Sequence, residues 1–364
     1  MKVTLTTLFV IITSCILSSA LGQTNRIAPS DPNIMITGRT YQNADGHIEF
    51  DWPGVSIAAS FSGNSISLIM DDTGLNFYNV FIDNALQKVI TVSSDTILLL
   101  ADHLAKGPHA LLLTKRTEGF AGKATFKGIL LDDKGKILQA GDRPEKKIEF
   151  IGNSITCGYG TEAKIKEEDF KPETENNYKS YAPITARAFG ANAHIIAHSG
   201  QGVVRNYGYK KKVSEYTMPD RYLQVFDEQK EPLWDFTSWK PDLVVINLGT
   251  NDFSTQPQPD EEVFVEGYMN LIGSVREQYG KLPVFCIVGP MTNEPCYSYV
   301  KKMVETLRTK QNDQNVYFIG IPVYLLEEAD WGAYHPKYSG QIKMAGHVVP
   351  VIASVMGWEY GEIK

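Results

Sequence analysis

The sequence predicts a two-domain α/β protein, in which an all-β sandwich precedes a domain built on a mainly parallel sheet. Up to about residue 142, short runs of alternating apolar and polar residues are separated by turn residues, with no helical run between them. From about residue 144, strand-like runs alternate with helix-like runs. At 364 residues, the chain also has room for about two domains of ordinary size.

The first 22 residues are expected to be a signal peptide. A positively charged start is followed by an apolar stretch over residues 5–21, and small residues just before Gln23 suit cleavage there. A retained membrane anchor is one alternative, but the stretch is short for a membrane span and rich in Ser and Thr. A lipoprotein signal at Cys15 is another, which the apolar residues after it disfavour. We therefore expect a secreted or periplasmic protein whose mature chain has no integral membrane segment.

Composition and charge exclude some classes of partner. Hydrophobic residues make up 43% of the chain and charged residues 21%, which is typical of a globular protein. The net charge is −7 and the chain lacks a basic stretch, so we expect no nucleic-acid binding. Beyond the signal segment, the cysteines are Cys157, Cys286 and Cys296, and the sequence leaves their disulfide state open. None has the spacing of a zinc site, so we expect no metal.

The predicted sandwich covers residues 28–142. Its clearest strand-like runs are residues 55–61, 65–70, 77–82 and 110–113. This part of the chain displays no chemistry of its own, and we expect a structural or glycan-contacting module.

The predicted α/β domain covers residues 144–364. Its strands are expected at residues 148–152, 194–197, 243–248, 284–288 and 316–319. Its helices are expected at residues 178–189, 262–278, 297–310 and 339–356. This alternation predicts a parallel sheet with helices on both faces, and in such sheets sites form at the carboxyl ends of the strands.

Three successive strands deliver glycine and small polar residues to that edge. The segments are GNSIT at 152–156, HSGQG at 198–202 and GTND at 249–252. One such strand end is an ordinary turn, but three together exceed what turns require. We therefore expect a functional site there.

Ser154 is the candidate nucleophile of this site. The turn from strand to helix exposes a hydroxyl at the sheet edge, but the same position suits an N-cap, which stabilises a helix by about 1 kcal/mol. The strand-turn-helix nucleophile elbow of other hydrolases has the pattern GxSxG, and Thr156 breaks that pattern here.

A serine nucleophile needs a base, and His335 is the best candidate. It lies in a segment predicted to be a loop after the last strand, where Pro336 disfavours a helical backbone. His194 and His198 flank the second strand, and His347 lies in an apolar helix, where packing is the simpler interpretation. Donors for an oxyanion would be the backbone N–H groups of Ser154 and Gly200 and the side-chain amide of Asn251.

These segments together resemble the four sequence blocks of the SGNH (GDSL-like) hydrolases. The segments GNSIT, SGQG, GTND and HP occur in the family order. With the sandwich ahead of them, the layout resembles carbohydrate esterase family 2, the acetylxylan esterase-like enzymes. That resemblance implies a jelly-roll sandwich followed by a three-layer α/β/α hydrolase domain. It also implies an exported esterase that needs no cofactor and removes O-acetyl groups from polysaccharides or oligosaccharides such as xylan and glucomannan, often at 6-O positions.

The resemblance implies Ser154 as nucleophile and His335 as general base, with Gly202 as a weaker alternative to Gly200 in the oxyanion hole. Members of the superfamily usually carry an aspartate two or three residues before the histidine, where this chain has Gly332 and Ala333. We assign that role neither to Asp330 nor to Asp252, and expect another group, such as a backbone carbonyl, to orient His335. Asp252 is expected to brace the loop that carries Asn251.

Aromatic residues near the blocks suit sugar rings. Trp331, Tyr207 and, with it, Arg205 are the predicted substrate contacts, Trp331 first among them, and Tyr334 is a further neighbour of the histidine. Ordinary packing is the alternative for each. Two other functions stay open: a lipase or thioesterase of the same fold, and an inactive carbohydrate-binding protein. The sequence does not specify the polysaccharide or the oligomeric state.

Overall fold

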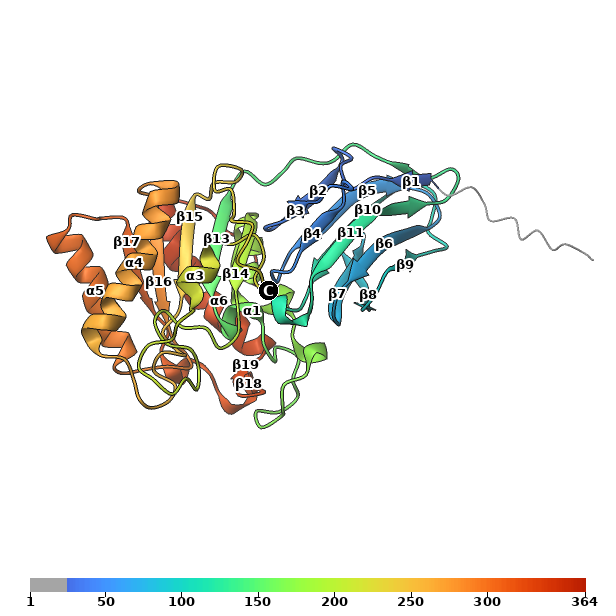
Figure 1. Cartoon of the computed structure of the whole chain (residues 1–364). Coiled ribbons are helices and arrows are strands. Elements are labelled where there is room, and N and C mark those ends of the chain that lie inside the picture. The colour runs from blue at the N-terminus through green and yellow to red at the C-terminus, as the bar shows by residue number, and fades with distance from the viewer. Residues whose placement is uncertain (1–24) are drawn as a thin grey trace, which may run out of the picture.

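The computed structural model describes residues 25–364, so the predicted signal peptide lies outside the described part of the chain. Figure 1 shows an all-β part, coloured blue to green, beside an α/β part coloured green to red. Strands of the first part lie between Asn25 and Ile137, and the parallel sheet of the second begins at Lys147. This is the architecture that the sequence predicts.

Two antiparallel sheets form the sandwich. One sheet has the order β3 (Tyr41–Gln42), β4 (Ile48–Phe50), β11 (Ala124–Leu131), β6 (Ile66–Asp72) and β9 (Thr96–Ala101), with β1 (Asn25–Ile27) also paired to β11. The other has the order β12 (Lys136–Ile137), β5 (Ser56–Ser62), β10 (Pro108–Lys115), β7 (Asn76–Ile82) and β8 (Ala85–Val92), with β2 (Ile34–Thr37) also paired to β5. Every second residue of β5 is buried, because alternate side chains of a strand point to opposite faces.

The second domain contains a five-stranded parallel sheet with the order β14 (Asn192–Ala197), β13 (Lys147–Gly152), β15 (Leu243–Asn247), β16 (Val284–Val288) and β17 (Val316–Gly320). Its helices are α1 (Ser154–Cys157), α2 (Tyr181–Phe189), α3 (Met218–Tyr222), α4 (Glu261–Tyr279), α5 (Cys296–Lys310) and α6 (Tyr338–Met356). Each predicted strand and helix is present, with ends within three residues of the prediction.

Helices cover both faces of this sheet, because alternate residues of each strand face opposite layers. In β13, Ile148 and Phe150 pack with α2 and α6, whereas Ile151 belongs to the core on the side of α4 and α5. Strands buried on both faces read as nearly continuous apolar runs, as these do. Helix α4 begins with Glu261 and Glu262 and carries Arg276 in its last turn, charges that suit the helix dipole.

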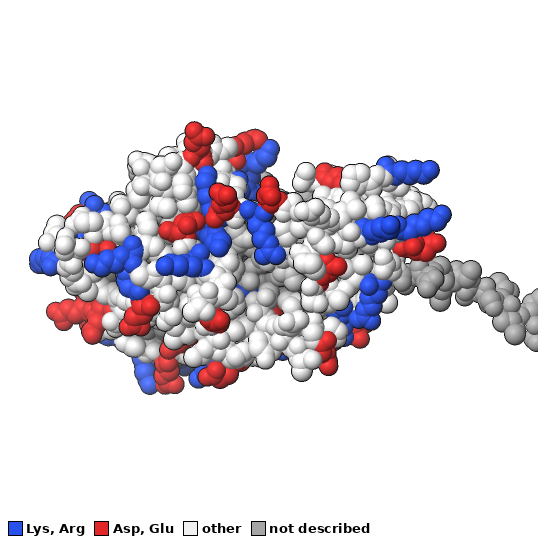
Figure 2. All heavy atoms as spheres, turned by 90° about the horizontal axis from the view of Figure 1, so that it is seen from above, with Lys and Arg blue, Asp and Glu red and all other residues white. Residues whose placement is uncertain are grey.

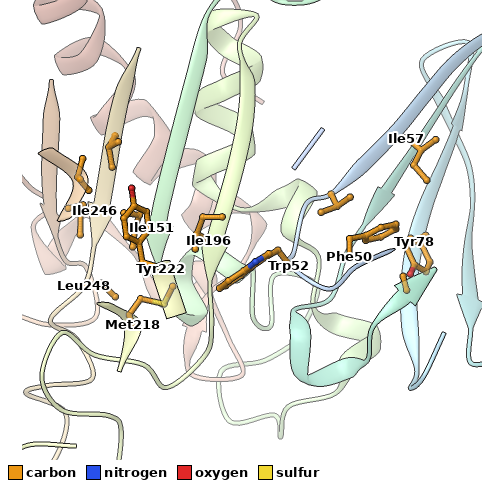
Figure 3. Packing of buried hydrophobic residues seen from close by; sticks show 14 of the residues in the cluster. Phe50, Trp52, Ile57, Tyr78, Ile151, Ile196, Met218, Tyr222, Ile246 and Leu248 are labelled. Atoms are coloured by element: carbon orange, nitrogen blue, oxygen red, sulfur yellow. The ribbon is translucent and has the colours of Figure 1, made fainter. Parts of the chain in front are cut away.

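The two domains share one continuous hydrophobic core. Trp52 is fully buried and lies between Phe50 of the sandwich and Ile196 of the parallel sheet (Figure 3). Its indole N–H donates to the carbonyl of Val225 at 2.8 Å. A buried ion pair, Arg39–Glu149 at 3.1 Å, also crosses this interface.

The segment that carries His335 differs from the sequence prediction. It is a small hairpin rather than a loop, formed by β18 (Trp331–Gly332) and β19 (His335–Pro336). The two turn residues, Ala333 and Tyr334, have φ angles of 49° and 59°, as a two-residue type I′ turn requires. A two-stranded element with a non-glycine turn carries little sequence signal, so pattern analysis misses it.

Charged side chains of both signs are interspersed over the face seen in Figure 2. Among the helices of residues 25–364, none combines the length and hydropathy that a bilayer crossing requires. Cys157, Cys286 and Cys296 are buried and free.

Candidate active site

The structure joins Ser154 to His335 across 181 residues of sequence. Ser154 is the first residue of α1, directly after β13, and its Oγ lies 2.8 Å from Nε2 of His335. The helix is capped by Asn153, whose side chain accepts a hydrogen bond from the N–H of Ile155. The serine is therefore not the helix cap, and its hydroxyl is directed to the histidine.

His335 is oriented by a backbone carbonyl. Its Nδ1 lies 2.9 Å from the carbonyl oxygen of Ala333, two residues earlier in the same hairpin. A carbonyl only accepts hydrogen bonds, so Nδ1 carries the proton of the neutral ring and Nε2 presents its lone pair to Ser154. Burial lowers the pKa of His335 to about 4, although the bond to Ala333 opposes this shift. The neutral ring is thus the form present at neutral pH.

Asp330 does not replace the missing aspartate. Its carboxylate accepts hydrogen bonds from Ser339 Oγ at 2.7 Å and from Lys343 Nζ at 2.6 Å. These contacts tie the hairpin to the start of α6. The ring of Tyr159 instead packs on His335, with ring centroids 4.2 Å apart.

The other histidines near the sheet are engaged elsewhere. Nδ1 of His198 lies 2.7 Å from Asp227. Burial lowers the pKa of His198, but the charge of Asp227, the hydrogen bond to it and the charge of Glu118 together outweigh burial and raise the pKa to about 9. His198 is therefore protonated at neutral pH and cannot accept a proton. His194 stacks on Trp239, with centroids 3.6 Å apart, and His347 bonds to the carbonyl of Gly320.

The backbone places two N–H groups at the same strand ends. Gly200 has a φ of 77°, a left-handed conformation that favours glycine. Within residues 25–364, the N–H groups of Ser154 and Gly200 donate to no protein acceptor. The N–H of Gly202 donates to the side chain of Asn206 at 3.1 Å. Of the two glycines, Gly200 has the free donor.

Asn251 lies in the same pocket. Its amide donates one hydrogen to the carbonyl of Gln201 at 2.8 Å, which leaves its second hydrogen for a ligand. Asp252 ties the loop that carries Asn251 to the neighbouring loop, because its carboxylate accepts from the backbone N–H groups of Val203, Val204 and Arg205. Burial raises its pKa to about 6 despite these donors.

A pocket of about 720 Å³ opens over these groups. Its lining includes Ser154, Tyr159, Ser199, Gly200, Tyr207, Asn251, Tyr334, His335 and residues of the segment 291–294. That segment follows β16, so applying the strand-end rule to the fourth predicted strand would have found it.

The predicted aromatic contacts separate into two groups. Tyr207 and Tyr334 line the pocket, and they are 66% and 55% exposed. Trp331 does not line the pocket, and Lys166 lies over its ring at 5.8 Å. Arg205 is fully buried and donates to the carbonyls of Tyr209, Lys211 and Asp252 and to the side chain of Thr255. A substrate contact therefore fits neither Trp331 nor Arg205.

Sequence reasoning missed Tyr159 and Glu118. Tyr159 is part of the segment that begins with Ser154, but its packing on His335 depends on the fold. Glu118 belongs to the sandwich and contacts Ser199, the residue before Gly200. Nothing in the sequence links it to a site 81 residues away.

Comparison with known proteins supports the architecture. The family model "Carbohydrate esterase 2 N-terminal" matches residues 36–140, and the "GDSL-like Lipase/Acylhydrolase family" matches residues 150–342. A protein named "Acetylxylan esterase / glucomannan deacetylase" from Cellvibrio japonicus is 30% identical over 276 residues, which cover 71% of this chain and 73% of that protein.

The chain belongs to carbohydrate esterase family 2. Like other family 2 esterases, it is a carboxylic-ester hydrolase of the GDSL type. It is 37% identical over 333 residues to "Cellulase/esterase CelE" of Acetivibrio thermocellus, and this match covers 90% of the chain but only 40% of that longer protein.

Solved structures of family 2 esterases have the same fold. A family two carbohydrate esterase from Clostridium thermocellum, in complex with cellohexaose, is 36% identical with a TM-score of 0.83. The match covers 89% of this chain and 99% of that one. A family two esterase from Cellvibrio japonicus is 26% identical with a TM-score of 0.84, covering 93% and 99% of the two chains.

Proposed function

We propose that this family 2 esterase is an exported enzyme that removes O-acetyl groups from polysaccharides such as xylan or glucomannan, with an acetyl-enzyme on Ser154. The observation that carries this proposal is the 2.8 Å contact between Ser154 Oγ and His335 Nε2, beside the free N–H groups of Ser154 and Gly200. The names of its relatives and the oligosaccharide in a related structure support a carbohydrate substrate.

In the first step, Ser154 Oγ attacks the acetyl carbonyl and gives its proton to His335 Nε2. The developing oxyanion accepts from the N–H of Ser154, the N–H of Gly200 and the free amide hydrogen of Asn251. His335 then donates its proton to the departing sugar hydroxyl. Water, activated by the same nitrogen, hydrolyses the acetyl-enzyme and regenerates the serine. The carbonyl of Ala333 stabilises the imidazolium in both steps and keeps the ring in place.

The lining of the pocket offers polar groups and exposed rings that suit a sugar. Beside Ser154 it includes the polar residues Ser199, Thr250, Asn251, Ser254, Thr292, Asn293 and Glu294. Exposed rings of Tyr207 and Tyr334 flank this polar surface, where they can stack on pyranose faces. The lining also includes Phe253, Met291 and Ala333, and the acyl-chain comparison below tests a lipase or thioesterase.

Acetate release from acetylated glucomannan and xylan tests the proposal. We expect the wild type to release acetate and Ser154→Ala to lose about 10⁴-fold or more of kcat. Butyrate and octanoate esters serve as comparison substrates and should be poor. If the wild type binds the polysaccharide without releasing acetate, the chain is a binding protein on an esterase scaffold. Rapid octanoate hydrolysis would instead favour a lipase.

A further inference from the structure

The sandwich domain reaches the active site through Glu118. This residue precedes the 3₁₀ turn η1 (Gly119–Ala121), just after β10, and its side chain is fully buried. The turn packs closely on the hydrolase domain, since a Cβ added at Gly119 would lie 2.5 Å from the Cβ of Asp227. Glu118 is therefore a residue of one domain enclosed by the other.

Both carboxylate oxygens of Glu118 contact Ser199, the residue before the oxyanion glycine. The backbone N–H of Ser199 donates to Oε2 at 2.6 Å, and the Ser199 hydroxyl donates to Oε1. Lys115 fixes the backbone on either side of this contact, since its buried Nζ donates to the carbonyls of Thr117 and Glu118 at 2.6 and 3.1 Å. Ser199 is thus fixed by two bonds to a rigid partner.

The loop is held equally firmly on the far side of Gly200. The carbonyl of Gly200 accepts from the N–H of Tyr207 at 2.8 Å, and the carbonyl of Gln201 accepts from Asn251 at 2.8 Å. Gly200 itself has a φ of 77° and no side chain, so its own conformational preferences are weak. The direction of its N–H depends on the residues before and after it.

We propose that Glu118 is a positioning residue for the oxyanion hole: the sandwich domain fixes Ser199 so that the adjacent Gly200 N–H faces the reacting carbonyl. Donors of this kind act because they are already oriented when charge develops, and removing one costs about 10²- to 10³-fold in kcat. The proposal explains why a domain without catalytic groups precedes the hydrolase domain. It rests on the function proposed above.

Other groups near Glu118 are engaged in the interface and carry no separate site. Glu118, His198 and Asp227 lie close enough to share an ion. However, His198 Nδ1 bonds to Asp227, and the Glu118 oxygens accept from Ser199. Burial, and then the charge of Glu118, raise the pKa of Glu175.

The test compares Glu118→Ala, Glu118→Gln and Ser199→Ala in the full chain, with kcat expressed per active site titrated at Ser154. We expect kcat to fall about 10- to 100-fold in Glu118→Ala, with KM for acetylated substrate within about threefold of the wild type. Glutamine keeps one of the two contacts, so Glu118→Gln should lose about 3- to 10-fold. A boronic acid forms an adduct with Ser154 that places an oxygen in the oxyanion hole. Across these variants, its affinity should fall in proportion to kcat/KM.

Glu149→Gln is the matched control. Glu149 is also a fully buried carboxylate with a partner in the other domain, Arg39, but it lies at the opposite end of β13 from Ser154. This variant should lower the melting temperature while kcat per active site stays within about twofold of the wild type.

Unchanged kcat and boronate affinity in Glu118→Gln and Ser199→Ala would overturn the proposal, even if Glu118→Ala does not fold. An equal loss of kcat per site in Glu149→Gln would do the same, because the effect would then be general loosening of the interface. A wild type that releases no acetate contradicts the proposed function instead, and the two failures are distinguishable.

Discussion

Ser154 and His335, the proposed nucleophile and base, form a pair without a carboxylate. In most triads an aspartate orients the imidazole and stabilises its charged form. Here the carbonyl of Ala333 orients the ring at 2.9 Å and supplies only a dipole. Because no full negative charge offsets burial, the imidazole resists protonation, and this has a measurable consequence for the pH dependence of the enzyme.

We predict that the acid limb of kcat/KM lies near pH 4. The active form of His335 is neutral, and burial lowers its pKa from 6.5 to about 4. Activity should therefore persist as pH falls through 6.5 and decline only as pH passes through about 4. Initial rates on an acetylated oligosaccharide between pH 3.5 and 8 measure this, with circular dichroism showing that the protein stays folded. An acid limb between pH 6 and 7 would contradict the burial argument.

The positions of two aromatic residues predict opposite outcomes for similar mutations. Tyr207→Ala removes an exposed ring from the pocket and should raise KM for acetylated polysaccharide about 3- to 10-fold. KM for a small acetyl ester that does not reach this ring should stay unchanged. Trp331→Ala is the comparison variant, because Trp331 lies outside the pocket, and it should leave both KM values within about twofold. A larger effect of Trp331→Ala would show that substrate extends beyond the pocket.

The hairpin β18–β19 carries conformational strain next to the histidine. Ala333 and Tyr334 both have positive φ, which costs a residue with a Cβ about 1 kcal/mol. The turn is maintained by the hydrolase domain, because the N–H groups of Ala333 and Tyr334 donate to the carbonyls of Ile165 and Lys166 at 3.0 and 2.7 Å. A strained turn that is maintained by hydrogen bonds from a neighbouring segment is typical of a functional position.

We predict that Tyr334→Asn stabilises the protein and weakens the binding of polysaccharide. Asparagine tolerates the left-handed conformation, so the free energy of unfolding should rise by about 0.5–1 kcal/mol. Loss of the ring from the pocket should raise KM for polysaccharide. Urea denaturation and steady-state kinetics measure the two effects. Tyr324→Asn is the control, since Tyr324 is 87% exposed without a positive φ and should give no gain. A stability loss in Tyr334→Asn would contradict the strain argument.

The two domains share their interior and should behave as one folding unit. Trp52 connects the sandwich core to Ile196 and Met218 of the hydrolase domain (Figure 3). The interface also contains Glu149, which accepts from Arg39 and from the hydroxyls of Tyr222 and Tyr279. Separating the domains would remove Arg39 from the buried carboxylate of Glu149 and expose the indole of Trp52, so neither domain should unfold alone.

We predict that Trp52→Ala lowers the free energy of unfolding by about 3–5 kcal/mol, the range for removing a fully buried large aromatic side chain. Far-ultraviolet circular dichroism and tryptophan fluorescence should report a single transition in the wild type. Ile97→Ala provides the comparison, because Ile97 is 62% exposed and its loss should change stability by less than about 0.5 kcal/mol. Two resolved transitions in the wild type would show that the cores are independent.

The sequence by itself determined the two-domain order, the strands and helices of the parallel sheet, and Ser154, His335, Gly200 and Asn251 as candidate site residues. The sequence predicts the elements because the periodicity of hydrophobic residues indicates local secondary structure. It predicts the site residues because parallel strands bring their carboxyl ends to one edge of the sheet.

Only the tertiary structure decided what orients His335, which aromatic rings reach the pocket, and that Arg205 is internal. It alone showed Glu118 of the sandwich bonded to Ser199, next to Gly200. These facts depend on side-chain packing and on contacts between residues far apart in the chain. No local pattern encodes such contacts, because a buried arginine and a substrate-binding arginine are the same letter in the sequence, and so are a pocket tryptophan and a packed one.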